Sequence, residues 1–141
     1  MSVQRECVAF LELVREDQTD FQAMRDLLQA QFDAALRHDP VRVATVCESI
    51  SALTERITQR GQERLALARR ISGTQGDAAY EMVQAALPLG VRATVKQWYT
   101  DLQAMVTECQ RLNTRNCDLL MGQHEIMQRV LNDEVHTYAP A

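Results

Sequence analysis

The residues of this chain that could do chemistry are few and lie far apart in the sequence. The histidines and cysteines are His38, His124, His136, Cys7, Cys47, Cys109 and Cys117. A di-metal site in a helical protein needs Glu-x-x-His pairs on facing helices, and the sequence contains no such tetrapeptide. Single cysteines without a CxxC spacing indicate reduced thiols in a cytoplasmic protein. The sequence therefore predicts a cytoplasmic location, no metal site and no cofactor.

Motifs for covalent or phosphate chemistry are also missing. The sequence has no Gly-x-Ser-x-Gly nucleophile turn, no Gly-rich phosphate loop and no Gly-x-Gly-x-x-Gly dinucleotide turn. The formal net charge is −4, and the arginines of residues 56–70 are interleaved with glutamates, which is a poor footprint for nucleic acid. No run of 18 apolar residues occurs that could insert into a membrane. We expect a protein that is not an enzyme.

Composition favours helices. The chain has 141 residues, of which 46% are hydrophobic and only 5% aromatic, with 5 glycines and 3 prolines. Strands and their turns draw on aromatic residues, glycine and proline, so an all-β fold is disfavoured. The length is that of about one domain. We expect residues 1–141 to form a single helical domain.

Apolar residues recur at alternating steps of three and four, which is typical of helices packed in a coiled coil. The expected segments are a helix at 1–37, a helix at 39–72, a loop with a short helix at 73–87 and a helix at 88–136. The fold class predicted is all-α, an antiparallel three-helix coiled-coil bundle with a long third helix and an amphipathic C-terminal segment.

Local signals set the boundaries of these helices. The residue before a proline avoids the α region, and aspartate is a strong N-cap, so Asp39-Pro40 starts the second helix. Gly73 suits the end of that helix, and Asp77 suits the start of the short one. The apolar seams have polar interruptions at Asp17, Gln31, Arg60, Arg64 and Asn116. Asn116 would fix the register of a coiled-coil core.

The three long helices differ in length. At 1.5 Å per residue the first two span about 50 Å each and the third about 70 Å. The partners of the third helix therefore end near residues 120–124, and the remainder overhangs. The overhang carries an apolar face, made of Leu119, Leu120, Ile126, Met127, Val130 and Leu131. Such a face needs a partner, and the methionines suit an adaptable protein-binding surface.

Residues 112–123 read Leu-Asn-Thr-Arg-Asn-Cys-Asp-Leu-Leu-Met-Gly-Gln. This stretch resembles the Leu-Asn-x-x-Asn-x-x-Leu-Leu-x-Gly-Gln signature of the FlgN family, which are flagellar type III export chaperones for the hook–filament junction proteins. The motif residues are Leu112, Asn113, Asn116 and Gly122, together with Leu119, Leu120 and Gln123. A tryptophan upstream, Trp98, and a tyrosine near the C-terminus, Tyr138, extend the similarity.

The resemblance implies a cytoplasmic chaperone that binds C-terminal segments of junction proteins, prevents their premature assembly and delivers them to the export gate. The client-binding residues would be Leu119, Leu120, Gln123, Ile126, Met127, Val130 and Leu131. The resemblance further implies that Tyr138 contacts the cytoplasmic domain of the export-gate membrane protein. Two alternatives stay open: a chaperone or adapter of another type III secretion system, and a structural coiled-coil protein that dimerises through the overhang.

Overall fold

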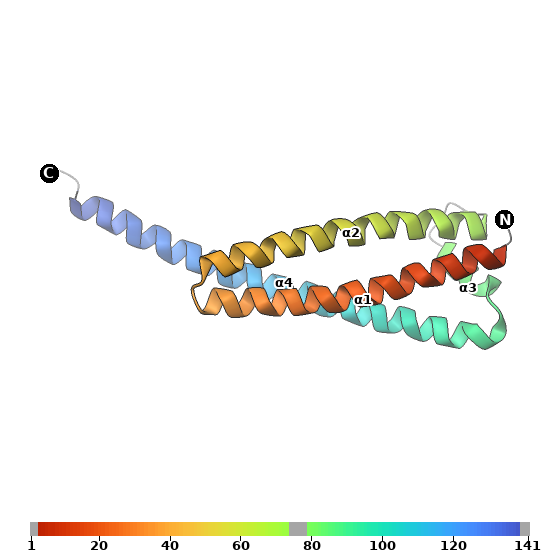
Figure 1. The fold of residues 1–141 in the computed structure, drawn as a ribbon. Coiled ribbons are helices and arrows are strands. Elements are labelled where there is room, and N and C mark those ends of the chain that lie inside the picture. Colours follow the sequence, from red (N-terminus) through yellow and green to blue (C-terminus); the bar gives the residue numbers. More distant parts are fainter. Residues whose placement is uncertain (1–2, 74–78, 139–141) are drawn as a thin grey trace.

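The computed structural model describes residues 3–73 and 79–138, with side chains over 4–71 and 83–129. All regular secondary structure in these residues is helical. The helices are α1 (Val3–Leu36), α2 (Pro40–Ser72), α3 (Ala79–Ala86) and α4 (Leu89–Tyr138) (Figure 1). The predicted all-α fold class is confirmed, while the assignment of residues 1–141 to one domain stays a prediction.

The corner between α1 and α2 is closed by backbone hydrogen bonds. His38 adopts a left-handed backbone conformation, with φ 54°. The N–H groups of His38 and Asp39 donate to the carbonyls of Ala35 and Ala34 respectively, each over 3.1 Å, which is a Schellman motif. Asp39 Oδ1 then accepts from the backbone N–H of Arg42 over 3.0 Å. The predicted N-cap is confirmed, and the following proline occupies the first turn of α2.

The connection from α2 through α3 to α4 is capped at its described ends. Gly73 takes φ 69°, and its N–H donates to a carbonyl of the last turn of α2 over 2.9 Å, so the predicted helix end is confirmed. The predicted N-cap at Asp77 lies outside the described residues. The guanidinium of Arg92 on α4 donates to the carbonyls of Leu87, 2.9 Å away, and Ala85, 2.5 Å away. These bonds satisfy carbonyls that the end of a short helix leaves open.

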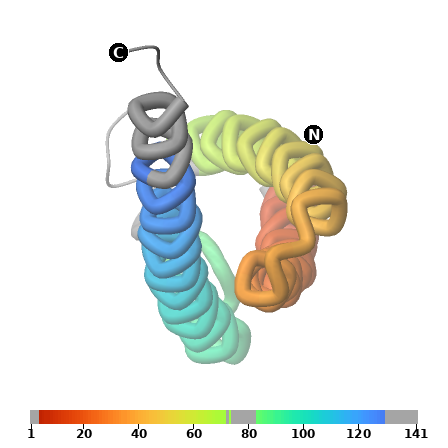
Figure 2. The backbone as a smooth tube through the Cα atoms, turned by 90° about the vertical axis from the view of Figure 1, so that its left-hand side faces the viewer, coloured from red at the N-terminus to blue at the C-terminus, as the bar shows by residue number. Residues whose placement is uncertain are grey.

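α1 is the helix that holds the others in place. It packs extensively against both α2 and α4, and within the described residues no comparable contact joins α2 to α4 (Figure 2). The thiol of Cys109 lies 3.5 Å from the Phe21 carbonyl oxygen, and Gln123 Nε2 donates to the Ala35 carbonyl over 2.8 Å. Both pairs are 88 residues apart, so α4 runs parallel to α1 in one constant register. The arrangement as an antiparallel three-helix coiled-coil bundle stays a prediction.

The apolar core lies in two main clusters along α1. The cluster at the N-terminal end of α1 contains Phe10, Val14, Leu67, Ala68, Val83 and Leu102. The cluster nearer the corner contains Met24, Leu28, Leu53, Cys109 and Leu112. Trp98 packs against the first cluster, as its position on the apolar seam predicts, and the Arg15 guanidinium lies 5.3 Å from its ring centroid. Each cluster draws side chains from α1, α2 and α4, so burial of apolar surface holds all three together.

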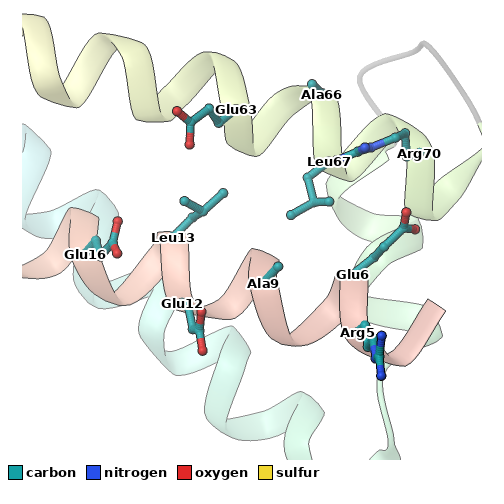
Figure 3. A pocket seen from close by; sticks show the side chains of 10 residues that line it. All are labelled: Arg5, Glu6, Ala9, Glu12, Leu13, Glu16, Glu63, Ala66, Leu67 and Arg70. Carbon is teal, nitrogen blue, oxygen red and sulfur yellow. The ribbon is translucent and has the colours of Figure 1, made fainter. Parts of the chain in front are cut away.

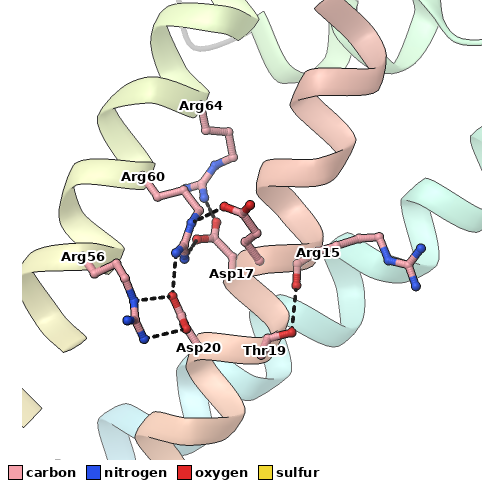
Figure 4. A network of polar contacts seen from close by, with 8 residues as sticks. Arg15, Asp17, Thr19, Asp20, Arg56, Arg60 and Arg64 are labelled. Atoms are coloured by element: carbon pink, nitrogen blue, oxygen red, sulfur yellow. Dashed lines mark hydrogen bonds and ion pairs between the residues drawn. The ribbon is translucent and has the colours of Figure 1, made fainter. Parts of the chain in front are cut away.

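Between the two clusters, charged side chains join α1 to α2 (Figure 4). They are Glu16, Asp17 and Asp20 on α1, and Arg56, Arg60 and Arg64 on α2. Arg60 reaches all three carboxylates, at 3.0, 3.2 and 2.6 Å in sequence order. Asp17 is fully buried and pairs with both Arg60 and Arg64. The polar residues that interrupt the apolar seams of α1 and α2, Asp17 on one side and Arg60 and Arg64 on the other, therefore pair with each other across the interface.

Asp20 shows the electrostatic effect of this network. Burial opposes ionisation of its carboxyl group, but the hydrogen bonds from Arg56 and Arg60 outweigh that cost. The pKa of Asp20 is therefore held below its ordinary value. The network therefore favours the ionised form of Asp20. Its ion pairs hold α1 and α2 in one alignment.

Candidate functional site

Asn116 is almost fully buried on α4, and its amide is hydrogen-bonded at both ends. Its Nδ2 donates to the carbonyl of Leu28 over 2.6 Å and to Oε1 of Gln31 over 2.9 Å. Its Oδ1 accepts from Nε of Arg115 over 3.2 Å. Gln31 Nε2 in turn donates to the sulfur of Cys47 on α2, 3.2 Å away. This chain of contacts connects α4, α1 and α2 and suits the register-fixing role expected of Asn116.

Gln123 makes the bond to α1 that lies nearest the corner. Its Nε2 donates to the Ala35 carbonyl, and α1 ends one residue later, at Leu36. α4 continues beyond this point and runs past the corner (Figure 1). Two large apolar side chains on this part are largely exposed, Ile126 at 62% and Met127 at 57%. The point at which α4 leaves α1 agrees with the length comparison made from the sequence.

A groove of about 640 Å³ opens between this part of α4 and the corner. Its apolar lining comes from Ala35, Pro40, Val43, Ala44, Leu120, Ile126 and Met127. Its polar lining comes from His38, Asp39, Gln123 and His124. An apolar floor with a few polar groups at its edge is typical of a surface that receives a partner's side chains. We call this the corner groove.

The structure places the predicted motif residues at different depths. Leu112 belongs to the core, whereas Asn113 is exposed. Leu119 is half-buried, like Leu120 on the wall of the corner groove. Gly122 is also half-buried, and a Cβ built there would meet nothing within 4 Å. Close packing is therefore not what requires glycine at this position.

The remaining predicted residues divide into two groups. Gln123 lines the corner groove but already donates its Nε2 hydrogen bond to α1, so its part in client binding stays a prediction. The side chains of Val130, Leu131 and Tyr138 lie outside the described part of the chain. The backbone of α4 includes all three positions, and their roles stay predictions.

Sequence reasoning missed the wall of the corner groove that belongs to the corner itself. Pro40, Val43 and Ala44 form this wall, and Leu36 and Val41 beside them are exposed at 53% and 76%. The sequence did contain a signal for this wall. Apolar residues stand on both sides of the tight corner, where most side chains are exposed and polar residues are expected. Their function depends on α4 passing beside them, which the pattern of one helix does not specify.

The described side chains offer little for reaction chemistry. Burial raises the pKa of the Cys7 and Cys109 thiols, which keeps them protonated and unreactive. Cys117 is the exposed cysteine. Among the described residues, no three His, Cys, Asp or Glu side chains gather in a way that could hold a metal ion. The same residues include no helix that is long and apolar enough to cross a membrane. The absence of a metal and a cofactor stays a prediction.

Comparison with known proteins decides the family. The sequence pattern of the FlgN protein family matches residues 8–132, which is most of the chain. The chain belongs to the FlgN family. FlgN proteins are flagellar export chaperones of the type III pathway and bind flagellar proteins, which is consistent with a chain that is not an enzyme. No curated protein and no solved structure matches significantly.

In this FlgN-family chain, the residues of the family signature follow α4 from the core to the corner groove. Asn116 and Gln123 hold α4 against α1 through side-chain amides. Leu120, which lies between these two residues in the sequence, lines the corner groove. The signature therefore combines residues that hold α4 against α1 with residues on its apolar side. We call this side, with Leu119, Leu120, Ile126 and Met127, the open face of α4.

Proposed function

We propose that this chain binds the C-terminal helical segments of hook–filament junction proteins in the cytoplasm, keeps them from assembling early and delivers them to the type III export gate. The observation that carries the proposal is the end of α4. Beyond Gln123 it leaves α1, and Ile126 and Met127 remain exposed beside the corner groove. Covering such a face with a client helix removes apolar surface from water, which favours the complex.

The client helix would lie along the open face of α4 and press against the corner. Fully burying an aliphatic side chain contributes about 1.5–3 kcal/mol, and Ile126 and Met127 have most of that area still to bury. Leu119 and Leu120 extend this face toward the bundle. Val130 and Leu131 follow Ile126 and Met127 by four residues each, so helical spacing continues the face toward the C-terminus.

Covering the client's own apolar segment is sufficient to prevent assembly, because that segment is then unavailable to other subunits. No catalytic group is required. Delivery needs a second contact, for which Tyr138 is the proposed residue on the basis of the family resemblance. Its position at the end of α4 would leave it near the bound client and free to meet the cytoplasmic domain of the export-gate protein.

Co-purification tests the proposal. The chain is co-expressed with a tagged junction protein, once unchanged and once with Ile126→Asp and Val130→Asp. A charge on the open face must be desolvated on binding, so we expect loss of co-purification with no change in the thermal unfolding midpoint. Val8→Asp is the matched control, since Val8 is 56% exposed on α1. It should retain the client.

Two results would contradict the proposal. One is full retention of the client by the Ile126→Asp, Val130→Asp variant. The other is a wild-type chain that captures no junction protein but forms a dimer, which the same variant dissociates. The second result would establish the open face as a self-association surface.

A further inference from the structure

A second groove lies between α1 and α2 at the end remote from the corner, and we propose that it binds a basic amphipathic helix of a partner protein (Figure 3). Its volume is about 620 Å³, and its lining comes from α1 and α2. We call it the acidic groove. It shares no lining residue with the corner groove, so the inference does not depend on the proposed client site.

The floor of the acidic groove is apolar. Ala9 on α1 is small and points toward α2, which leaves a trough between the two helices (Figure 3). Leu13 and Leu67 point into the space between α1 and α2 (Figure 3). Leu67 also belongs to the core, so the floor is continuous with the packed interior. A stripe of apolar side chains on an incoming helix would find complementary surface here.

The rim of the acidic groove is charged and mainly negative. Its charged residues are Glu6, Glu12, Glu16, Glu63, Arg5 and Arg70. Glu16 is bound to Arg60 of the ionic network, whereas Glu12 and Glu63 are exposed on opposite sides of the groove. With Glu16 already paired, Glu6, Glu12 and Glu63 outnumber Arg5 and Arg70, so the rim keeps a negative excess that attracts lysine and arginine and repels acidic segments. Charge complementarity therefore selects a basic partner.

The length of the groove sets the size of that partner segment. Its lining on α1 runs from Arg5 to Glu16, which is about 17 Å of helix, or about three turns. The partner segment is thus a short helix with an apolar stripe flanked by basic residues. Because the two grooves lie at opposite ends of α1, a client and a second partner can be bound together (Figure 1).

Peptide binding to the full chain tests the inference. The probe is a fluorescent three-turn peptide with a leucine stripe flanked by lysines, and its twin carries glutamates in place of the lysines. Fluorescence anisotropy should show binding of the lysine peptide and none of the twin. Glu12→Gln with Glu63→Gln should weaken binding about threefold to tenfold, as expected for losing two exposed charge pairs. Glu48→Gln with Glu55→Gln, on exposed α2 positions outside the groove, is the matched control.

A bulky substitution that fills the groove distinguishes docking in the groove from general charge attraction. Ala9 is half-buried and points from α1 toward α2 (Figure 3), so Ala9→Trp fills the trough and should abolish binding. Equal loss in the matched control, or unchanged binding to Ala9→Trp, would overturn the proposal. Sedimentation of the unliganded chain tests whether a second copy occupies the groove: if the wild type is a dimer that Ala9→Trp dissociates, the groove receives a second copy and the proposal is wrong. Helical circular dichroism of each variant verifies that it is folded.

Discussion

The side-chain nitrogen of Asn116 lies 2.6 Å from the main-chain carbonyl oxygen of Leu28, and both residues are buried. A helix carbonyl has a second lone pair free for such a bond. α4 cannot slide along α1 without breaking this bond and the one to Gln31, and the buried Nδ2 would then be left without an acceptor. This contact, together with that of Gln123, determines where α4 leaves α1 and how much of its apolar face stays open.

Asn116→Ala should destabilise the chain by about 1–3 kcal/mol, because it removes three hydrogen bonds and leaves Oε1 of Gln31 without its donor. Urea unfolding followed by circular dichroism measures the change. Asn113→Ala is the matched control on the same helix, since Asn113 is exposed and should change stability by less than about 0.5 kcal/mol. Similar effects of the two substitutions would show that Asn116 does not fix the helix.

The stability of the chain should fall with acid through Asp20. Its pKa is lower in the folded than in the unfolded chain because Arg56 and Arg60 bond the carboxylate against the cost of burial. The folded state then binds fewer protons, so this stabilisation is complete above the unfolded pKa of about 3.9 and is lost as the pH falls through the folded value. Urea unfolding at a series of pH values from neutral to strongly acidic measures it.

Asp20→Asn should lower stability at neutral pH and make the decline in acid shallower. Asp26→Asn, at an exposed position on the same helix, should keep the wild-type pH dependence. A wild-type acid profile in Asp20→Asn would rule out the ionic network as its cause.

His38→Gly should raise the free energy of unfolding by about 1 kcal/mol, because a left-handed backbone is costly for residues with a Cβ and not for glycine. Urea unfolding detects the gain. His38→Ala keeps the Cβ and should give no gain, which separates the backbone effect from loss of the imidazole. Equal stability of the Gly and Ala variants would contradict this explanation.

Thiol labelling should follow burial. At mildly alkaline pH an aromatic disulfide reagent should modify Cys117 fastest and Cys7 and Cys109 slowest, because burial raises the pKa of the latter two and shields them. Absorbance of the released thiolate gives the rates. Cys117→Ser should remove the fast phase, and a fast phase that persists in this variant would show that half-buried Cys47 or one of the buried thiols is open to solvent.

Much of the fold follows from local rules. The Asp39 cap, the Gly73 helix end and the long last helix were predictable because each depends on residues within a turn or two, or on the apolar spacing itself. The pairing of Asp17 with Arg60 and Arg64 was not, since it needs the relative alignment of two helices. The sequence shows only that each seam is interrupted.

The candidate site was predictable to a similar extent. The apolar face with Ile126 and Met127 is visible in the sequence because the helix that carries it is longer than the two helices expected to pack against it. The corner wall at Pro40, Val43 and Ala44 was missed, since it becomes part of a groove only when α4 passes beside it. The bond from Gln123 to α1 was also unforeseen, because a polar residue on an amphipathic helix does not reveal which neighbour it meets.

Calorimetric titration of the purified chain with the C-terminal segment of a junction protein tests the central claim most directly. The wild type is compared with Ile126→Asp and with Ala44→Trp, which fills the corner groove from an exposed position. The account predicts a complex with the wild type, affinity at least about tenfold weaker for each variant and unchanged urea midpoints, since about 1.4 kcal/mol of lost apolar burial gives that factor. Wild-type affinity in both variants would contradict it.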